Sequence, residues 1–196
     1  MDKVFQEESR NLAEIIGKLE LIVSRYQAEA DQLAVERNQF RCVDYSDRER
    51  FLELRNDWQK AENRAQKYRD FQDRPYFGRL DFDREIGDEL ESFTYYIGEK
   101  GIADSSDIIV LDWRTPIGNC YYAHNQKEFE IKDIKYALAL RRALEIKNGA
   151  LISYRTDYDG EPVSLEGDVV DPFLLPVLKD KRRHNRLTNI IRTIQG

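Results

Sequence analysis

The stretch FQEESRNLAEIIGKLELIVSRYQAEADQLAVERNQF, residues 5–40, decides the fold of this 196-residue chain. In it an apolar residue recurs every seven positions: Phe5, Leu12, Leu19, Tyr26, Leu33 and Phe40. Further apolar residues fill the adjoining positions: Ile15, Ile16, Ile22, Val23 and Ala30. This spacing draws one apolar stripe along a helix and is typical of knobs-into-holes packing. It predicts a helix from Asp2 to about Gln39, roughly 55 Å long because each residue adds 1.5 Å.

A second apolar stripe follows in steps of three and four residues: Phe51, Leu54, Trp58, Ala61, Ala65 and Tyr68. We expect Ser46 to cap this second helix, with Glu49 completing a capping box. Arg74-Pro75 should end it, because proline disfavours helix in the residue before it. About six residues, 41–46, separate the two helices, and so short a connection predicts antiparallel neighbours. The sequence therefore predicts a protruding helical hairpin; the alternative is a helical pair folded against a globular core.

Three residues at the predicted turn of this hairpin are the candidate partner-binding residues: Asp44, Tyr45 and Asp47. Carboxylates at an exposed tip can coordinate or compete for a metal ion that a partner holds. The alternative is that both are solvated acids and that Asp47 supports the start of the second helix. The surrounding arginines, Arg41, Arg48 and Arg50, dilute any acidic tip.

From Pro75 the apolar period changes. Short aromatic and β-branched runs, at 76–82, 92–98, 107–113, 119–124 and 128–134, predict strands. The run 136–146 is rich in alanine and leucine, but four of its apolar residues keep strand parity: Leu138, Leu140, Leu144 and Ile146. Asn148-Gly149 is a strong hairpin signal, so we expect this run to pair with 150–157. Arg142 breaks the apolar parity of the predicted strand.

The last segment is predicted to be helical, with Asp171 as N-cap and Pro172 at the first helical position. It contains the one basic cluster of the chain: Lys181, Arg182, Arg183 and Arg186. This cluster is a weak candidate for contact with phosphate or nucleic acid, and a solvated helical face is the alternative. The fold class expected for the whole chain is α+β: a coiled-coil arm (1–74), a β-rich body (75–170) and a helical lead-in (171–196).

Composition excludes several classes of protein. The net charge is −6 and the pI about 5.2, which argues against nucleic-acid binding by the whole surface. The two cysteines, Cys42 and Cys120, form no metal or disulfide pattern, and the two histidines lie far apart. The N-terminus resembles no signal peptide and no apolar run could span a membrane. We expect a cytoplasmic protein.

Several runs resemble the HelD-like proteins. PYFGRLDF at 75–82 is similar to the PYFGRIDF run of that family, YIG at 96–98 matches, and DWRTPI at 112–117 resembles DWRAPI. The IKNG hairpin and the closing TIQ at 193–195 follow in the expected order, and Leu80 and Thr115 are the departures. The signature residues are Tyr76, Phe77, Gly78, Arg79, Asp81, Phe82, Asp112, Trp113, Arg114 and Pro116.

This resemblance implies a bacterial ATPase related to the UvrD and Rep DNA helicases. Such proteins bind RNA polymerase, insert a coiled-coil arm into its secondary channel and help to release it from nucleic acid. ATP and magnesium are expected for the full-length protein, whose phosphate-binding loop would follow the TIQ run. Residues 1–196 contain no GxxxxGK[ST] run, since Gly17-Lys18 is followed by Leu19. We therefore expect neither a bound cofactor nor ATPase activity in this region.

Three alternatives stay open. The first is an accessory region of a UvrD/Rep-like helicase whose arm touches DNA, and the second is an arm that dimerises. The third is a metal-dependent nuclease that uses Asp112, Glu130 and Lys132. Against the nuclease, Glu130 and Lys132 alternate with apolar residues and fit a solvent-facing strand side. For Asp112 and Arg114 we favour a structural role in a turn, whereas Arg79 and Asp81 share a strand face and could pair with neighbouring strands.

Overall fold

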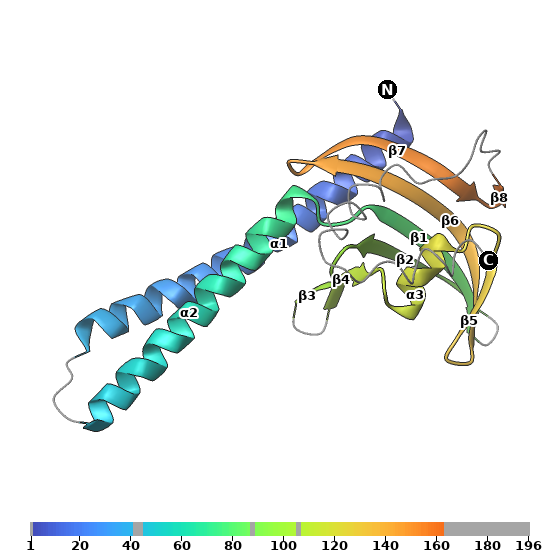
Figure 1. Cartoon of the computed structure of the whole chain (residues 1–196). Helices are drawn as coiled ribbons and strands as arrows, with labels where there is room; N and C mark the ends of the chain where they lie inside the picture. The colour runs from blue at the N-terminus through green and yellow to red at the C-terminus, as the bar shows by residue number, and fades with distance from the viewer. Residues whose placement is uncertain (1, 41–44, 87–88, 105–106, 163–196) are drawn as a thin grey trace, which may run out of the picture. The chain divides into compact units, whose positions relative to one another are not determined.

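The computed structural model describes residues 2–40, 45–86, 89–104 and 107–162, and it has the expected α+β class (Figure 1). The chain forms two compact units. One contains the two long helices up to Pro75 together with the turn Ile146–Leu151. The other contains Tyr76–Glu145 and the described residues from Ile152 onward.

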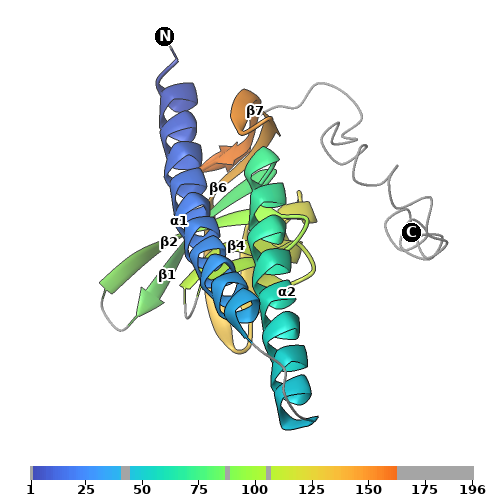
Figure 2. The same ribbon diagram turned by 90° about the vertical axis from the view of Figure 1, so that its left-hand side faces the viewer.

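The first unit is built on α1 (Lys3–Gln39) and α2 (Tyr45–Asp73), which lie side by side and run in opposite directions (Figure 2). Asp2 caps α1, because its Oδ1 accepts the N–H of Val4 at 3.0 Å. Part of the expected apolar stripe of α1 is buried, namely Leu12, Ile15, Leu19, Ile22 and Ala30, whereas the heptad residues Phe5, Tyr26, Leu33 and Phe40 are half-buried. On α2 the buried members of the stripe are Leu54, Ala61 and Ala65. The two predicted helices are therefore confirmed, and the heptad positions are fully buried only at Leu12 and Leu19.

Contacts between the helices confirm the antiparallel arrangement. The rings of Tyr26 and Tyr68 stack with centroids 5.8 Å apart. Nearer the end of α1, the guanidinium of Arg37 lies 4.6 Å from the ring centre of Trp58. The later residue of α1, Arg37, thus contacts the earlier residue of α2, Trp58. This reversed order is that of an antiparallel pair.

The predicted capping box is wrong. The helix α2 begins at Tyr45, so Ser46 lies inside its first turn rather than at the cap. A cap must stand outside the helix for its side chain to accept an N–H of the first turn. Asp47 lies in the first turn, where its carboxylate is stabilised by the positive end of the helix dipole. The predicted end is confirmed, since α2 stops at Asp73, two residues before Pro75.

The β-strands form one eight-stranded sheet, in the order β3-β4-β2-β1-β6-β7-β8 with β5 paired to β6. The pair β2–β4 is parallel, and the others with a described register are antiparallel. The strands are β1 (Gly78–Ile86), β2 (Glu89–Gly98), β3 (Ile102–Asp104), β4 (Asp107–Asp112), β5 (Glu128–Ile131), β6 (Ile134–Lys147), β7 (Ala150–Asp159) and β8 (Glu161–Pro162).

One face of this sheet carries an aromatic core. The ring of Phe82 lies edge-on to Phe129 and steeply inclined to Tyr136, with both centroids 5.7 Å away. Phe77 and Tyr121 form another edge-on pair at 5.5 Å. Edge-to-face geometry places the positive rim of one ring against the negative face of the other, which stabilises the core beyond simple burial.

The predicted strand at 119–124 is wrong. Its first four residues lie instead at the end of the short helix α3 (Pro116–Asn119) and in the 3₁₀ helix η1 (Cys120–Tyr122), and Ala123 and His124 follow in a turn. Thr115 caps α3, since its Oγ1 accepts the N–H of Gly118 at 3.1 Å. The aromatic residues suggested a strand, but Tyr121 is fully buried in the core from a helical turn.

The hairpin of β6 and β7 is confirmed, with positive φ at both turn residues, Asn148 (51°) and Gly149 (69°). The prediction that Leu138 and Leu140 lie on the same face of β6 is wrong. Asp81 pairs with Leu140 but Phe82 pairs with Leu138, so one extra residue forms a β-bulge. Because opposed residues share a face, Leu138 lies on the core face and Leu140 on the other.

The prediction that Arg142 breaks the alternation of β6 is wrong. Arg142 lies on the face of Leu140, is 5% exposed and donates from Nε to Thr156 Oγ1 at 3.1 Å. A buried arginine is tolerated there because its charged head has polar partners. The predicted helices at 171–196 lie outside the described residues.

Candidate partner-binding surface

The end of the helical pair at the start of α2 is the candidate partner-binding surface. Tyr45, the first residue of α2, has 82% of its surface exposed. Asp47 is half-buried in the first turn. Asp44 lies outside the described residues, as does the basic cluster at 181–186. The structure thus places two of the three predicted tip residues, Tyr45 and Asp47, in the first turn of α2.

Two further apolar side chains near this end are exposed, and sequence reasoning missed them. Val35 lies in the last turns of α1 and Leu52 in the second turn of α2, with 55% and 39% of their surfaces exposed. Because the helices are antiparallel, both residues lie within a few turns of Tyr45. Exposed apolar side chains that gather on a surface mark an interaction site more often than scattered ones. The sequence indicates their exposure only in that neither residue belongs to an apolar stripe.

Charged contacts hold the helices together at the same end. Arg50 donates to Glu36 across the pair at 3.5 Å and to Glu53 within α2 at 3.2 Å. These side chains are about half exposed, so each pair contributes only about 0–1 kcal/mol. The guanidinium of Arg37 over Trp58 adds a cation–π contact. These contacts join α1 to α2 close to the exposed side chain of Tyr45.

The signature run PYFGRLDF, whose last five residues begin β1, has a packing role. Tyr76, Phe77 and Phe82 are buried. A Cβ at Gly78 would come within 2.5 Å of the ring of Tyr121, so only glycine allows that ring to lie against the strand. Conserving a glycine here would serve core packing.

Arg79 and Asp81, which the sequence places on one strand face, pair with each other. The Nε and Nη2 atoms of Arg79 donate to the two carboxylate oxygens of Asp81 at 2.9 and 2.8 Å. The two residues are separated by one position, so their side chains emerge on the same face of β1. This two-pronged geometry fixes both side chains along the strand.

The second signature run, DWRTPI, forms a turn at the end of β4. Asp112 accepts the backbone N–H of Arg114 at 2.9 Å and its Nε at 2.8 Å. Hydrogen bonding to Asp112 raises the pKa of Arg114 above its ordinary value. A Cβ at Gly118 would lie 2.4 Å from the carbonyl oxygen of Asp112, so the following helix packs directly on this turn. Pro116 begins that helix, and Trp113 lies edge-on to Tyr122.

The nuclease hypothesis finds no support in this geometry. Glu130 lies on β5, but Lys132 lies in the following turn with a φ of 53° and not on the strand, which corrects the expected alternation. Asp112 is engaged by Arg114. Among the residues that the structure describes, no group of three or more histidine, cysteine, aspartate or glutamate side chains could hold a metal ion.

A buried arginine was missed by the sequence reasoning. Arg141 is 1% exposed and its Nη2 donates to the carbonyl oxygens of Cys120 and Ala123 at 3.1 and 2.8 Å. Burial lowers the pKa of Arg141, and the negative charge of Asp157 opposes this. Arg141 thereby holds the η1 turn against the sheet. The available signal was two adjacent arginines in an apolar strand, since one of them must face the core.

Residues 5–164 match a family model for a helicase N-terminal domain. The family is described as DNA helicase IV HelD, N-terminal domain, and because the match covers most of the chain, the chain belongs to it. A search of curated proteins found no match. Within the described ranges, no helix is long and apolar enough to cross a membrane.

Proposed function

We propose that this chain is the polymerase-docking region of a HelD-like helicase. The pair α1–α2 inserts its Tyr45 end into the secondary channel of bacterial RNA polymerase. The observation that carries the proposal is the exposed Tyr45 at the end of an antiparallel pair of 37- and 29-residue helices. A slender rod of roughly 45 to 55 Å suits entry into a channel. Membership of the HelD family supports the choice of partner.

ATP and magnesium are used by the full-length protein outside this region. The absence of a phosphate-binding loop from residues 1–196 supports this part of the proposal. The purified chain should show no ATP turnover above a buffer control. Turnover that persists through successive purification steps and depends on magnesium would contradict it.

The docking proposal is tested by titrating purified bacterial RNA polymerase into the labelled chain and measuring fluorescence anisotropy. Tyr45→Ala should weaken binding at least about tenfold, because an exposed aromatic anchor at the centre of an interface carries much of its energy. The matched control is Leu21→Ala, which removes a side chain that is 73% exposed about halfway along α1. Equal effects of both substitutions would contradict docking through the end of the arm.

The same titration with duplex DNA separates the polymerase from an accessory DNA-binding role. DNA binding that is tighter than polymerase binding and is lost in Tyr45→Ala would favour the DNA-contacting arm. Sizing the chain at rising concentration addresses dimerisation. A dimer that Leu21→Ala disrupts and polymerase does not compete with would favour a dimerising arm.

A further inference from the structure

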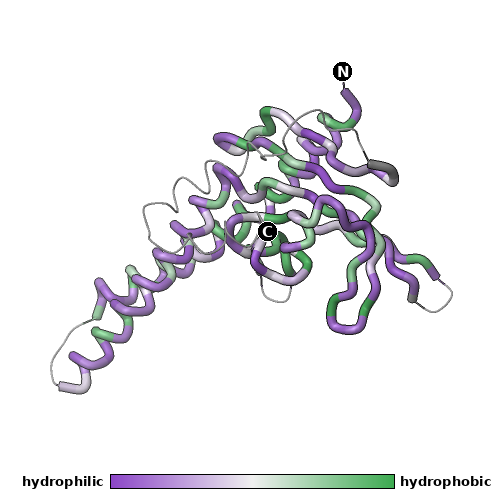
Figure 3. Tube along the Cα trace, turned by 45° about the vertical axis from the view of Figure 1, so that its right-hand side comes forward, coloured by the Kyte–Doolittle hydropathy of each residue, from purple (hydrophilic) through white to green (hydrophobic). Residues whose placement is uncertain are grey.

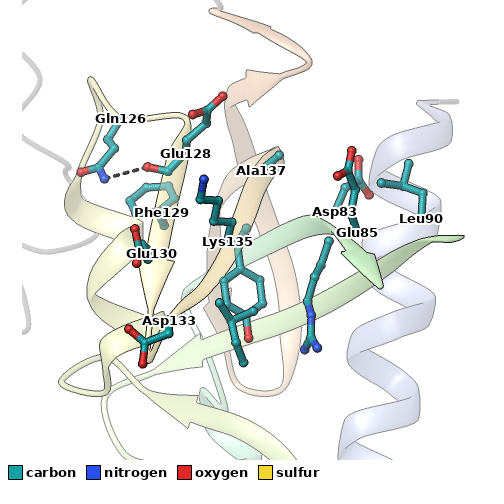
Figure 4. Close-up of a pocket in the computed structure, with 13 residues that line it drawn as sticks. Asp83, Glu85, Leu90, Gln126, Glu128, Phe129, Glu130, Asp133, Lys135 and Ala137 are labelled. Atoms are coloured by element: carbon teal, nitrogen blue, oxygen red, sulfur yellow. Dashed lines mark hydrogen bonds between the residues drawn. The ribbon is translucent and has the colours of Figure 1, made fainter. Parts of the chain in front are cut away.

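Two hairpins of the sheet separate into a fork. The pairing of β1 with β6 stops at Asp83 and Ala137, although β1 continues to Ile86 and β6 begins at Ile134. Beyond this point β1 remains paired with β2, and β6 with β5. The ribbons β1–β2 and β5–β6 diverge from there (Figure 3). Between them lies an open groove of about 870 Å³, which we call the fork (Figure 4).

Each arm of the fork has an open strand edge. Residues 84–86 of β1 and 134–136 of β6 have ladder partners on one side and, within the described part of the sheet, none on the side that faces the fork. An open edge offers alternating N–H and C=O groups that can pair with an added strand. The fork therefore has the backbone chemistry to receive an extended peptide.

The register gathers acidic side chains on one face of the fork. Asp83 and Glu128 both oppose Ala137, and Glu130 opposes Lys135. Opposed residues and residues two apart share a face, so Asp83, Glu85, Glu128 and Glu130 all lie on the same side of the sheet. The intervening residues of these strands, such as Phe82 and Phe129, point into the aromatic core on the opposite side. The fork thus has one acidic face, and on its other face Arg84 lies beside apolar side chains.

Acidic side chains outnumber basic ones along the lining of the fork. Its lining contains five carboxylates against two cationic side chains, Arg84 and Lys135. Asp83 accepts a hydrogen bond from Ser92 Oγ at 2.6 Å. Among the described residues the other four carboxylates, Glu85, Glu128, Glu130 and Asp133, form no ion pair. Leu90 on the same lining is 66% exposed.

We propose that the fork binds an extended, basic peptide segment of a partner protein by strand addition. The backbone of the peptide pairs with an open edge of the fork. Its lysine or arginine side chains, at alternate positions, meet Glu85, Glu128 and Glu130, while the positions between carry apolar side chains. Charge complementarity favours a basic partner, and the open strand edges favour a segment in the extended conformation. This binding site lies outside the arm and does not depend on polymerase docking.

The test measures anisotropy of a dye-labelled synthetic peptide of about eight alternating lysine and valine residues, an ordinary strand length. The complete chain should bind it saturably and more weakly as salt rises. A peptide of equal charge with prolines in place of valines should bind at least about tenfold more weakly, because proline has no N–H to donate. Equal binding of the two peptides overturns strand addition.

The site is assigned by charge reversal. Glu85→Lys with Glu130→Lys should weaken the lysine–valine peptide at least about tenfold, by replacing attraction with repulsion. The matched control, Glu14→Lys with Glu20→Lys, changes the net charge equally on an exposed side of α1 and should leave binding within about twofold. Equal losses in both variants overturn the assignment to the fork. Circular dichroism of both variants ensures that each remains folded.

A further variant separates a partner peptide from the basic cluster of the chain itself. Lys181, Arg182, Arg183 and Arg186 are replaced together by serine in the complete chain. Unchanged peptide affinity supports a site that is free to receive a partner. At least about tenfold tighter binding would show that the cluster competes for the fork and would overturn the partner as its occupant.

Discussion

Asp73, the last residue of α2, and Asn148, in the turn between β6 and β7, are joined by a hydrogen bond of 2.7 Å from the N–H of Asn148 to Asp73 Oδ1. The main-chain oxygen of Asp73 also accepts the N–H of Gly149 at 2.9 Å. The final carbonyls of a helix have no partner within it, and here the turn supplies one. A Cβ at Gly149 would lie 3.2 Å from the carbonyl oxygen of Gln72, so the turn packs closely on the helix end.

Replacing Asp73 with alanine should lower the free energy of unfolding by about 1 kcal/mol, the usual net contribution of one hydrogen bond. Asp73→Asn keeps an oxygen acceptor and should lose less. Urea denaturation followed by circular dichroism measures both. Asp70→Ala is the control, since Asp70 is exposed and its carboxylate accepts from Gln66 on the same helix. A loss no larger than that of the control would argue against the helix–turn contact.

Gly17→Ala should stabilise the first unit. Gly17 lies within α1, and a Cβ there would meet nothing within 4 Å. Alanine loses less backbone entropy than glycine in a helix, so we expect a gain of up to about 1 kcal/mol. Thermal unfolding monitored by circular dichroism reports the change. A lower melting temperature would mean that α1 bends or is contacted at this position.

Gly78→Ala should have the opposite effect. The added methyl group would overlap the ring of Tyr121, whose Cε2 is 2.5 Å away, and overpacking of a core costs about 1–3 kcal/mol. Tyr121→Leu removes the ring edge, so Gly78→Ala should cost less in that background. A double-mutant cycle in urea measures the coupling. Additive losses would show that the methyl group meets some other obstacle.

Cys120 should react slowly with thiolate-selective reagents. It is 6% exposed, and burial raises the pKa of its thiol above the ordinary value, which Arg141 partly opposes. Since the folded chain keeps the proton at a pH where the unfolded chain loses it, stability from this group falls as the pH rises above about 9. Iodoacetamide labelling of the Cys42→Ser variant across this range tests the reactivity, and urea denaturation at the same pH values tests the stability. A labelling rate equal to that in urea, or a stability that does not fall above this pH, would contradict the prediction.

The sequence was most informative where structure is local. The heptads of residues 5–40 and the Asn148-Gly149 pair predicted α1 and the β6–β7 hairpin, because helix periodicity and turn conformation depend on neighbouring residues. The bulge beside Leu138 and the helical turn at Tyr121 could not be predicted in this way. Both depend on partners far along the chain, namely Phe82 and Gly78.

The candidate site residues also differ in whether the local sequence could reveal them. Tyr45 and Asp47 were located as tip residues from the short connection alone, whereas the exposure of Val35 and Leu52 required both helices to be placed. The acidic fork was not visible in the sequence, because Glu85 and Glu130 are brought together by strand register.

The extra residue in β6 also constrains how this part of the chain can change in length. Deleting Ala139 would leave Leu138 beside Leu140, and regular alternation would then keep Leu138 opposite Phe82 on the core face and Leu140 opposite Asp81 on the other. Deleting Ala137 instead would carry Tyr136 to the side now taken by Lys135. Ala139 therefore marks the position in β6 where an alignment of related sequences can take a gap.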